Sequence, residues 1–186
     1  MRTIQVEQIT EAVANMCKEA CYYLPQDVYD ALVKGKETEE SPLWRDVLDQ
    51  IIRNADIARS EDRPICQDTG MTVVFMEIGQ DVQFAGGNLI DAVNAGVAKG
   101  YIEGYLRKSV VAEPLFDRKN TTNNTPAVIY TDIVPGDKLK IKLAPKGFGS
   151  ENKSALKMLV PADGKKKKKK VVLDTVIHAG ENPCPP

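Results

Sequence analysis

The sequence lacks an excess of positive or negative charge, which argues against proteins that bind nucleic acid or membranes through their net charge. Lys and Arg number 25 and Asp and Glu number 26, which gives a net charge of −1 over 186 residues. This balance provides no global attraction to nucleic acid or to a membrane surface. The sequence also lacks an apolar run long enough to cross a bilayer and an apolar leader of the signal-peptide type. We therefore expect a cytoplasmic protein without a nucleic-acid or membrane partner.

Cysteine and histidine are scarce. Without an export signal, the four cysteines indicate cytosolic thiols or metal ligands rather than a disulfide framework. Cys17 and Cys21 lie four residues apart on a predicted helix, where they would either fill the core or grip a metal. No other ligand type is nearby, which favours the core. His178, the only histidine, is expected near a helix C-terminus, where a protonated imidazole interacts favourably with the helix dipole. A catalytic role for it is the alternative.

Apolar periodicity predicts an α+β fold with a mixed or antiparallel sheet flanked by helices, in a single domain over residues 1–186. Predicted helices cover 4–24 and 25–36, with another beginning at Pro42 after an N-cap at Ser41 and one capped by Asn88. Predicted strands cover 71–79, 126–134 and 138–145. Residues 146–159 are expected to form a glycine loop followed by a helix, and 171–180 another helix.

Two compositional features leave alternatives open. Gly96, Gly100 and Gly104 are spaced four apart, which indicates either close backbone packing or a helix that ends before Gly104. The six lysines of residues 165–170 indicate a solvated linker. A nucleic-acid patch is the alternative, but no aromatic residues are interleaved with the lysines.

The stretch PICQDTG, residues 64–70, places a thiol among polar side chains. Asp68 lies two residues from Cys66, in a loop that precedes a predicted buried strand. Such a loop can present functional side chains on a rigid edge. Because Asp and Thr also stabilise turns routinely, ordinary turn chemistry remains an equal interpretation.

Two further segments could bind an anion. Lys146, Gly147, Gly149 and Ser150 form a glycine loop before a predicted helix, where exposed amides can bind anions. An ordinary helix entry explains the same pattern. Arg107 is either a solvated surface residue or, with a carboxylate substrate, a bidentate clamp.

Five stretches, in this order, carry a resemblance to a known family: RPICQDTGMTVVFMEIGQDV, GYLRKSVVAEPL, NTPAVIYTDIVPGD, KGFGSENKSALKML and NPCPP. Together they resemble the class I (iron–sulfur) fumarate hydratase family, which includes the L-tartrate dehydratase alpha subunit. The resemblance covers nearly the whole chain. PICQDTG followed by a strand ending in EIGQ is its most specific part.

The resemblance implies a [4Fe–4S] cluster held by three cysteines, two of which match Cys66 and Cys184. The family's third cysteine lies further along than residue 186. Gln67 and Asp68 would sit beside the open iron, with Asp68 in proton transfer. Arg107 would clamp a substrate carboxylate. Donors to the dicarboxylate would come from Lys146, Gly147, Gly149 and Ser150.

The implied function is the alpha-subunit portion of a hydro-lyase that interconverts fumarate and L-malate. A beta subunit or C-terminal domain would complete the active site, so this chain is expected to be inactive alone. L-Tartrate dehydration is the runner-up activity, and homo-oligomerisation is left open. A different class of function is a non-catalytic thiol or metal-binding module built from the cysteines at 17, 21, 66 and 184.

Overall fold

The computed structural model describes residues 1–149 and 151–180. The chain forms two compact units, residues 1–146 and 147–186. The mixture of helices with parallel and antiparallel strands confirms the α+β class. The expectation of a single domain over residues 1–186 stays a prediction.

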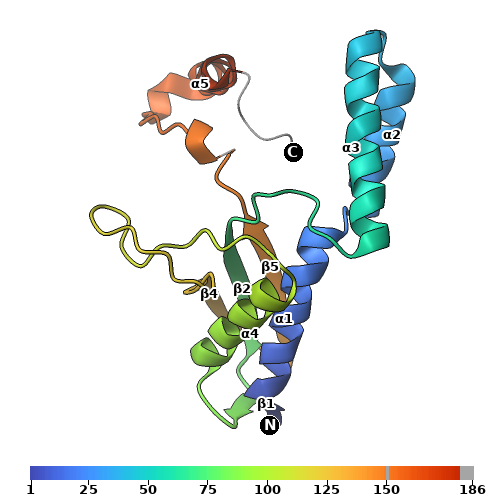
Figure 1. The fold of residues 1–186 in the computed structure, drawn as a ribbon. Helices are drawn as coiled ribbons and strands as arrows, with labels where there is room; N and C mark the ends of the chain where they lie inside the picture. The colour runs from blue at the N-terminus through green and yellow to red at the C-terminus, as the bar shows by residue number, and fades with distance from the viewer. Residues whose placement is uncertain (150, 181–186) are drawn as a thin grey trace. The chain divides into compact units, whose positions relative to one another are not determined.

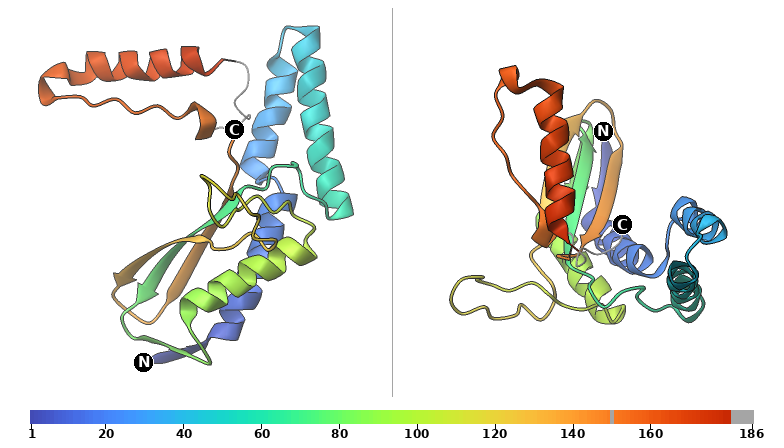
Figure 2. Two further views of the ribbon diagram at one scale, coloured as in Figure 1. Left: turned by 60° about the vertical axis from the view of Figure 1, so that its left-hand side comes forward. Right: turned by 90° about the horizontal axis from the view of Figure 1, so that it is seen from above.

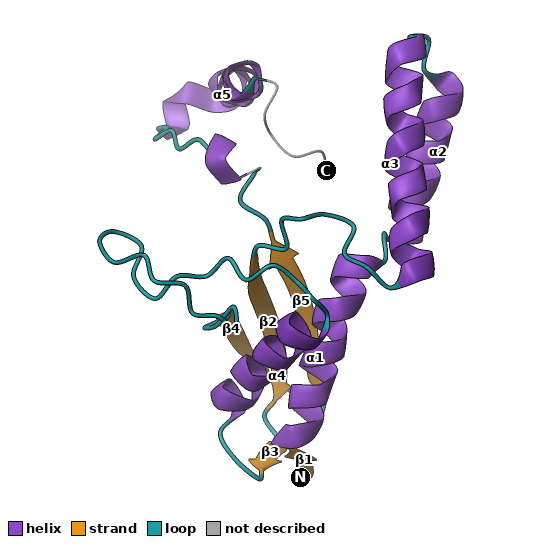
Figure 3. Ribbon diagram, in the orientation of Figure 1, coloured by secondary structure: helices purple, strands orange, loops and turns teal. Residues whose placement is uncertain are grey.

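The first unit contains most of the regular structure (Figures 1 and 3). Short strands and long helices alternate irregularly along it, in contrast to a doubly wound sheet. Its elements are β1 (Arg2–Gln5), α1 (Val6–Tyr22), α2 (Gln26–Thr38), α3 (Pro42–Glu61), β2 (Met71–Gly79), β3 (Val82–Ala85), α4 (Leu89–Glu103), β4 (Val128–Val134) and β5 (Leu139–Lys146).

A three-stranded sheet with the order β4-β2-β5 forms the centre of this unit. The central strand, β2, runs parallel to β4 and antiparallel to β5. Met71 at the start of β2 therefore lies opposite Lys146 at the end of β5. A separate pair, β1 and β3, is parallel. A turn at Pro135–Asp137 joins β4 to β5, and Gly136 adopts φ 103°, as position i+2 of a type II turn requires.

Helices α1 and α4 lie side by side over one face of the sheet (Figures 1 and 2). Alternate residues of β2 point into this layer, and Val74 is fully buried there. On the opposite face Phe75 stacks on Tyr130 with ring centroids 5.2 Å apart. Lys140 and Lys142 of β5 are exposed while Ile141 is half-buried, so one face of this strand is solvated and the other is partly covered.

Small residues allow α1 and α4 to approach closely. A Cβ atom on Gly96 would lie 2.6 Å from the Thr10 carbonyl oxygen, and one on Gly100 would lie 2.7 Å from that of Ala14. Helix α4 ends at Glu103, with Gly104 as its C-cap. Gly96 and Gly100 therefore provide the predicted close packing, and the helix ends before Gly104, as the other interpretation predicted.

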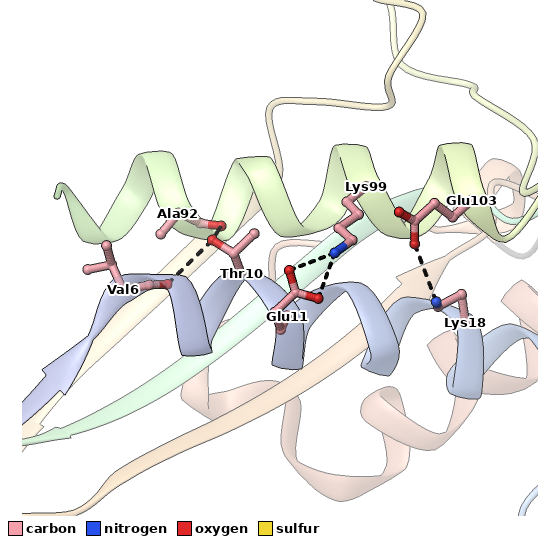
Figure 4. Close-up of polar contacts among 7 residues, drawn as sticks. All are labelled: Val6, Thr10, Glu11, Lys18, Ala92, Lys99 and Glu103. Carbon is pink, nitrogen blue, oxygen red and sulfur yellow. Dashed lines mark hydrogen bonds and ion pairs between the residues drawn. The ribbon is translucent and has the colours of Figure 1, made fainter. Parts of the chain in front are cut away.

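Polar contacts line the same helix pair (Figure 4). The Thr10 hydroxyl donates to the Ala92 carbonyl oxygen at 3.0 Å. The Lys99 ammonium contacts both Glu11 carboxylate oxygens at 2.6 and 2.7 Å, and Lys18 lies 3.6 Å from Glu103. Exposed ion pairs of this kind contribute little to stability. The glycine contacts therefore dominate the fit between the two helices.

Several predicted boundaries need correction. Residues 2–5 form β1 rather than the first turn of a helix, and β3 was not predicted. Asn88 caps α4 as predicted, with its side-chain oxygen accepting the amides of Ile90 (2.8 Å) and Asp91 (3.2 Å). Ser41 occupies the N-cap position of α3 but makes no side-chain cap hydrogen bond.

The second unit contains two 3-10 turns, η1 (Glu151–Lys153) and η2 (Pro161–Asp163), and the helix α5 (Gly164–Ala179). The helix predicted within 146–159 is wrong, because η1 is the only helical segment among the described residues of that stretch. The linker expected at residues 165–170 is also wrong: these lysines form the start of α5, where Lys167 pairs with Asp163 at 2.8 Å. Lysine is a good helix former, and this propensity outweighs the repulsion between neighbouring lysines in α5. His178 lies in the last turn of α5, as predicted.

None of the helices in the described part of the chain has both the length and the apolar composition needed to cross a membrane.

Candidate functional site

The PICQDTG loop is fixed to the helices that precede it. It connects α3 to β2 and is anchored at Ile65, whose amide donates to the Cys21 carbonyl oxygen at 2.9 Å. The Ile65 carbonyl oxygen accepts the Asn54 side-chain amide at 2.8 Å. The backbone on either side of Ile65 is therefore attached to two helices, which places the next residue, Cys66, at a defined position.

The polar side chains after Ile65 also shape the loop. Cys66 is exposed, and its sulfur accepts the Asp68 amide at 3.4 Å. An Asp68 carboxylate oxygen accepts the Gly70 amide at 3.0 Å. The turn chemistry expected of Asp68 is therefore present. It coexists with an exposed thiol two residues away.

An open pocket of about 670 Å³ lies against this loop. One wall is formed by the end of α3 and the loop, and the other by the segment that follows α4. Three residues singled out from the sequence lie around it, namely Cys66, Gln67 and Arg107, whereas Asp68 is not part of its lining. The sequence did not mark the remaining lining residues as site residues: Glu61, Asp62, Arg63, Pro64, Thr69, Gly104 and Tyr105.

The C-terminal end of α1 holds both walls. The buried Tyr22 donates its hydroxyl to the Gly104 carbonyl oxygen at 2.8 Å. The next residue, Tyr23, donates to an Asp62 carboxylate oxygen at 2.6 Å, which raises the pKa of the tyrosine. Adjacent tyrosines therefore attach opposite walls of the pocket to a single helix end.

Two residues of the lining have left-handed backbone conformations. Asp62, the C-cap of α3, has φ 50°, and Tyr105 has φ 52°. Tyr105 is an aromatic residue whose side chain is 88 % exposed, so no burial of its ring explains the conformation. Left-handed residues other than glycine are strained and cluster at functional sites.

The remaining described cysteines lie in the core. Cys17 is fully buried and Cys21 nearly so. Burial raises the pKa of each thiol to about 12. For Cys21, repulsion between its thiolate and that of Cys17 also contributes to the raised pKa. Buried protonated thiols are inert and poor metal ligands. Within residues 1–149 and 151–180, no cluster of three His, Cys, Asp or Glu residues could hold a metal ion.

The glycine-loop residues and Cys184 lie in different parts of the chain. Lys146 is the last residue of β5 and lies opposite Met71, at the end of the sheet where the PICQDTG loop leads into β2. Gly147 and Gly149 belong to the second unit. Ser150 and Cys184 lie outside the described residues. The grouping of these five residues with the pocket stays a prediction.

The family model and the curated relatives that match this chain agree on one family. The profile of the family described as "Fumarate hydratase (Fumerase)" matches residues 10–186. The chain is 40% identical over 184 residues to "Putative L(+)-tartrate dehydratase subunit alpha" of Methanocaldococcus jannaschii, covering 96% of this chain and 64% of that protein. It is 32% identical over 186 residues to "L(+)-tartrate dehydratase subunit alpha" of Escherichia coli O157:H7, covering 97% of this chain and 60% of that protein.

The chain thus spans less than two thirds of the length of either relative. The family match nevertheless extends through the pocket, from α1 to the segment after α4. The resemblance carried by PICQDTG and the other stretches is confirmed. The chain belongs to the fumarate hydratase (Fumerase) family.

Proposed function

We propose that this chain is the alpha-subunit portion of a [4Fe–4S]-dependent hydro-lyase that interconverts fumarate and L-malate. The observation that carries this proposal is one pocket lined by an exposed thiol, a carboxamide and a guanidinium, from Cys66, Gln67 and Arg107. Family membership supports the reaction class.

Cys66 is the cluster ligand we propose within the described residues, and Cys184 is the second. The exposed sulfur at the pocket accepts a backbone amide, and hydrogen bonds to sulfur are among the features that tune iron–sulfur centres. The donor chemistry therefore fits a sulfur-ligated iron. Further ligands are expected from outside the described residues. When bound, an iron without a full set of protein ligands would supply Lewis-acid chemistry at the hydroxyl to be removed.

Arg107 and Gln67, which line the pocket, would bind the dianion, and Asp68, which lies next to the lining residue Gln67, would move its proton. Arg107 offers a planar fork suited to a carboxylate, and Gln67 adds amide donors. We assign proton transfer at the carbon beside a substrate carboxylate to Asp68, because a carboxylate is suited to acid–base work. Its fixed position in the turn would orient it.

Donors for the second carboxylate are proposed from Lys146, Gly147, Gly149 and Ser150. These residues offer an ammonium, a hydroxyl and backbone amides, which are the kinds of donor that a carboxylate accepts. A beta subunit or C-terminal domain would complete the site. The relatives' names, which designate alpha subunits, support a partner of this kind.

L-Tartrate is the second candidate substrate, because both relatives are named tartrate dehydratase subunits. The two substrates differ by one hydroxyl. The test is kinetic: the chain is combined with its partner subunit, the cluster is reconstituted, and kcat/KM is compared for L-malate and L-tartrate.

Arg107→Ala tests the carboxylate clamp. We expect kcat/KM to fall about tenfold to a hundredfold, as loss of a charged hydrogen-bonding group predicts. Arg63→Ala is the matched control, since Arg63 lines the same pocket but pairs with Glu61 at 2.9 Å. Absence of turnover with both dicarboxylates would overturn the proposal. Equal losses of kcat/KM from the two arginine substitutions would show that Arg107 has no specific role in binding the carboxylate.

A further inference from the structure

We propose that Thr69 and Asn124 are positioning residues that hold the Cys66–Gln67 wall of the pocket at a fixed distance from the Arg107 wall. The inference rests on the proposed function for its consequence. Its structural content is independent, because the contacts join two chain segments whatever ligand the pocket takes.

Thr69 makes the direct link. Its hydroxyl donates to the carbonyl oxygen of Arg107 at 2.9 Å, across 38 residues of sequence. Its own carbonyl oxygen accepts the hydroxyl of Tyr101 at 2.6 Å. Thr69 lies two residues after Gln67, so the loop wall is attached both to α4 and to the backbone that carries the guanidinium.

Asn124 makes a second link beside the first. Its side-chain nitrogen donates to the Gly70 carbonyl oxygen at 3.0 Å. Its side-chain oxygen accepts the amides of Ser109 at 2.7 Å and Val110 at 3.2 Å. One carboxamide therefore connects the end of the PICQDTG loop to the segment just after Arg107.

The residues that make both links are buried. Asn124 and Tyr101 are 0 % exposed and Thr69 is 5 % exposed. A buried amide without partners would be costly, whereas this one makes three hydrogen bonds in a medium where they are strong. Asn124 has φ 62°, a left-handed conformation that Asn tolerates better than most residues. The geometry is thus restrained by side chains that are themselves buried.

These contacts differ in kind from those made by α1. Tyr22 and Tyr23 attach each wall to a third element, whereas Thr69 and Asn124 attach the walls to each other. A displacement of about 1 Å between reacting groups can reduce a rate a hundredfold. Loss of a direct link between the walls should therefore impair the site more than it impairs the fold.

Thr69→Val tests the link, because valine keeps the shape of threonine and removes the donor. In the reconstituted complex with L-malate we expect kcat/KM to fall about tenfold. Thr69→Ser retains the hydroxyl and should restore most of that loss. Asn88→Ala is the matched control: Asn88 also accepts two backbone amides, but at the start of α4. It should lower stability and leave kcat/KM near the native value.

A spectroscopic measurement separates this inference from the proposed function. The full chain, as a Cys184→Ser variant, is labelled at Cys66 with a trifluoromethyl reagent and observed by fluorine NMR. We expect a single resonance, unchanged by Asn88→Ala, and a shifted or divided resonance with Thr69→Val. An unchanged fluorine spectrum, or equal kinetic losses in Thr69→Val and Asn88→Ala, would overturn the inference. If the native complex acts on no dicarboxylate, the proposed function fails and the fluorine spectra alone decide the positioning role.

Discussion

The hydroxyl of Tyr22 donates to the carbonyl oxygen of Gly104 at 2.8 Å, and 82 residues of sequence separate the two. Tyr22 is only 8% exposed, and Gly104 lines the pocket. Burial raises the pKa of this tyrosine, so the hydroxyl remains a donor through the neutral pH range. The contact joins the end of α1 to the turn that follows α4.

Tyr22→Phe should therefore lower the free energy of unfolding by about 1–3 kcal/mol, because the buried carbonyl oxygen is left without its partner. Urea denaturation measures this. Tyr23→Phe is the matched control, since it removes a hydrogen bond to Asp62 at an exposed position. Its effect should be smaller. Equal losses in the two variants would contradict a special role for the buried contact.

Gly100→Ala should destabilise the α1–α4 pair. The new Cβ would meet the Ala14 carbonyl oxygen at 2.7 Å and the Cys17 Cβ at 2.9 Å, neither of which can rotate away. Overpacking of this kind costs about 1–3 kcal/mol. Gly35→Ala in α2 is the control, because its nearest neighbour is Leu48 at 3.9 Å. That variant should gain about 0.5–1 kcal/mol from helix propensity. Thermal unfolding of both should give opposite signs.

The core thiols predict a loss of stability at alkaline pH. Burial raises the pKa of Cys17 and Cys21 from 9.0 to about 12. Between these values the unfolded chain loses thiol protons that the folded chain keeps, so stability falls as pH rises. Below pH 9 the contribution is fully present. Urea titrations from pH 8 to 11 measure the slope. The double variant Cys17→Ala, Cys21→Ala should reduce it, and an unchanged slope would exclude these thiols as its source.

Tyr105→Gly should stabilise the chain. A left-handed backbone costs an L-residue about 1–2 kcal/mol, which glycine avoids at some entropic cost, so a gain of up to about 1 kcal/mol is expected. Tyr105→Ala separates the backbone from the side chain, which is 88 % exposed at φ 52°. Alanine should leave stability near the native value. If both variants unfold at the same urea concentration, the backbone conformation at this position is not strained.

Much of the first unit could be predicted from local patterns. The run of β-branched and aromatic residues at 71–79 indicated a buried strand, and β2 has those bounds. Asn88 indicated a helix start, and α4 begins at the next residue. Strands β1 and β3 could not be found this way. Each is four residues long, and each exists because it pairs with the other, which lies far away in the sequence.

The site could be predicted only in part. The resemblance selected Cys66, Gln67 and Arg107, which line one pocket. It did not select Thr69 or Asn124, because their partners are backbone carbonyl and amide groups. Such groups leave no side-chain pattern in a sequence, so these links become visible only when distant segments are placed in space. The lysines at 165–170 were misassigned for a different reason: composition indicated solvation, which a solvent-exposed helix also satisfies.

The position of β2 at the centre of the sheet has a consequence for biosynthesis. Its partners, β4 and β5, both follow it in the chain, and the last paired residue is Lys146. During translation at about 5–20 residues per second, β2 therefore waits for several seconds with both edges unpaired. Unpaired apolar edges recruit other strands. Emergence of β5 from the ribosome ends this exposure, so a pause in translation before residue 146 would be the point of greatest risk for aggregation of the nascent chain.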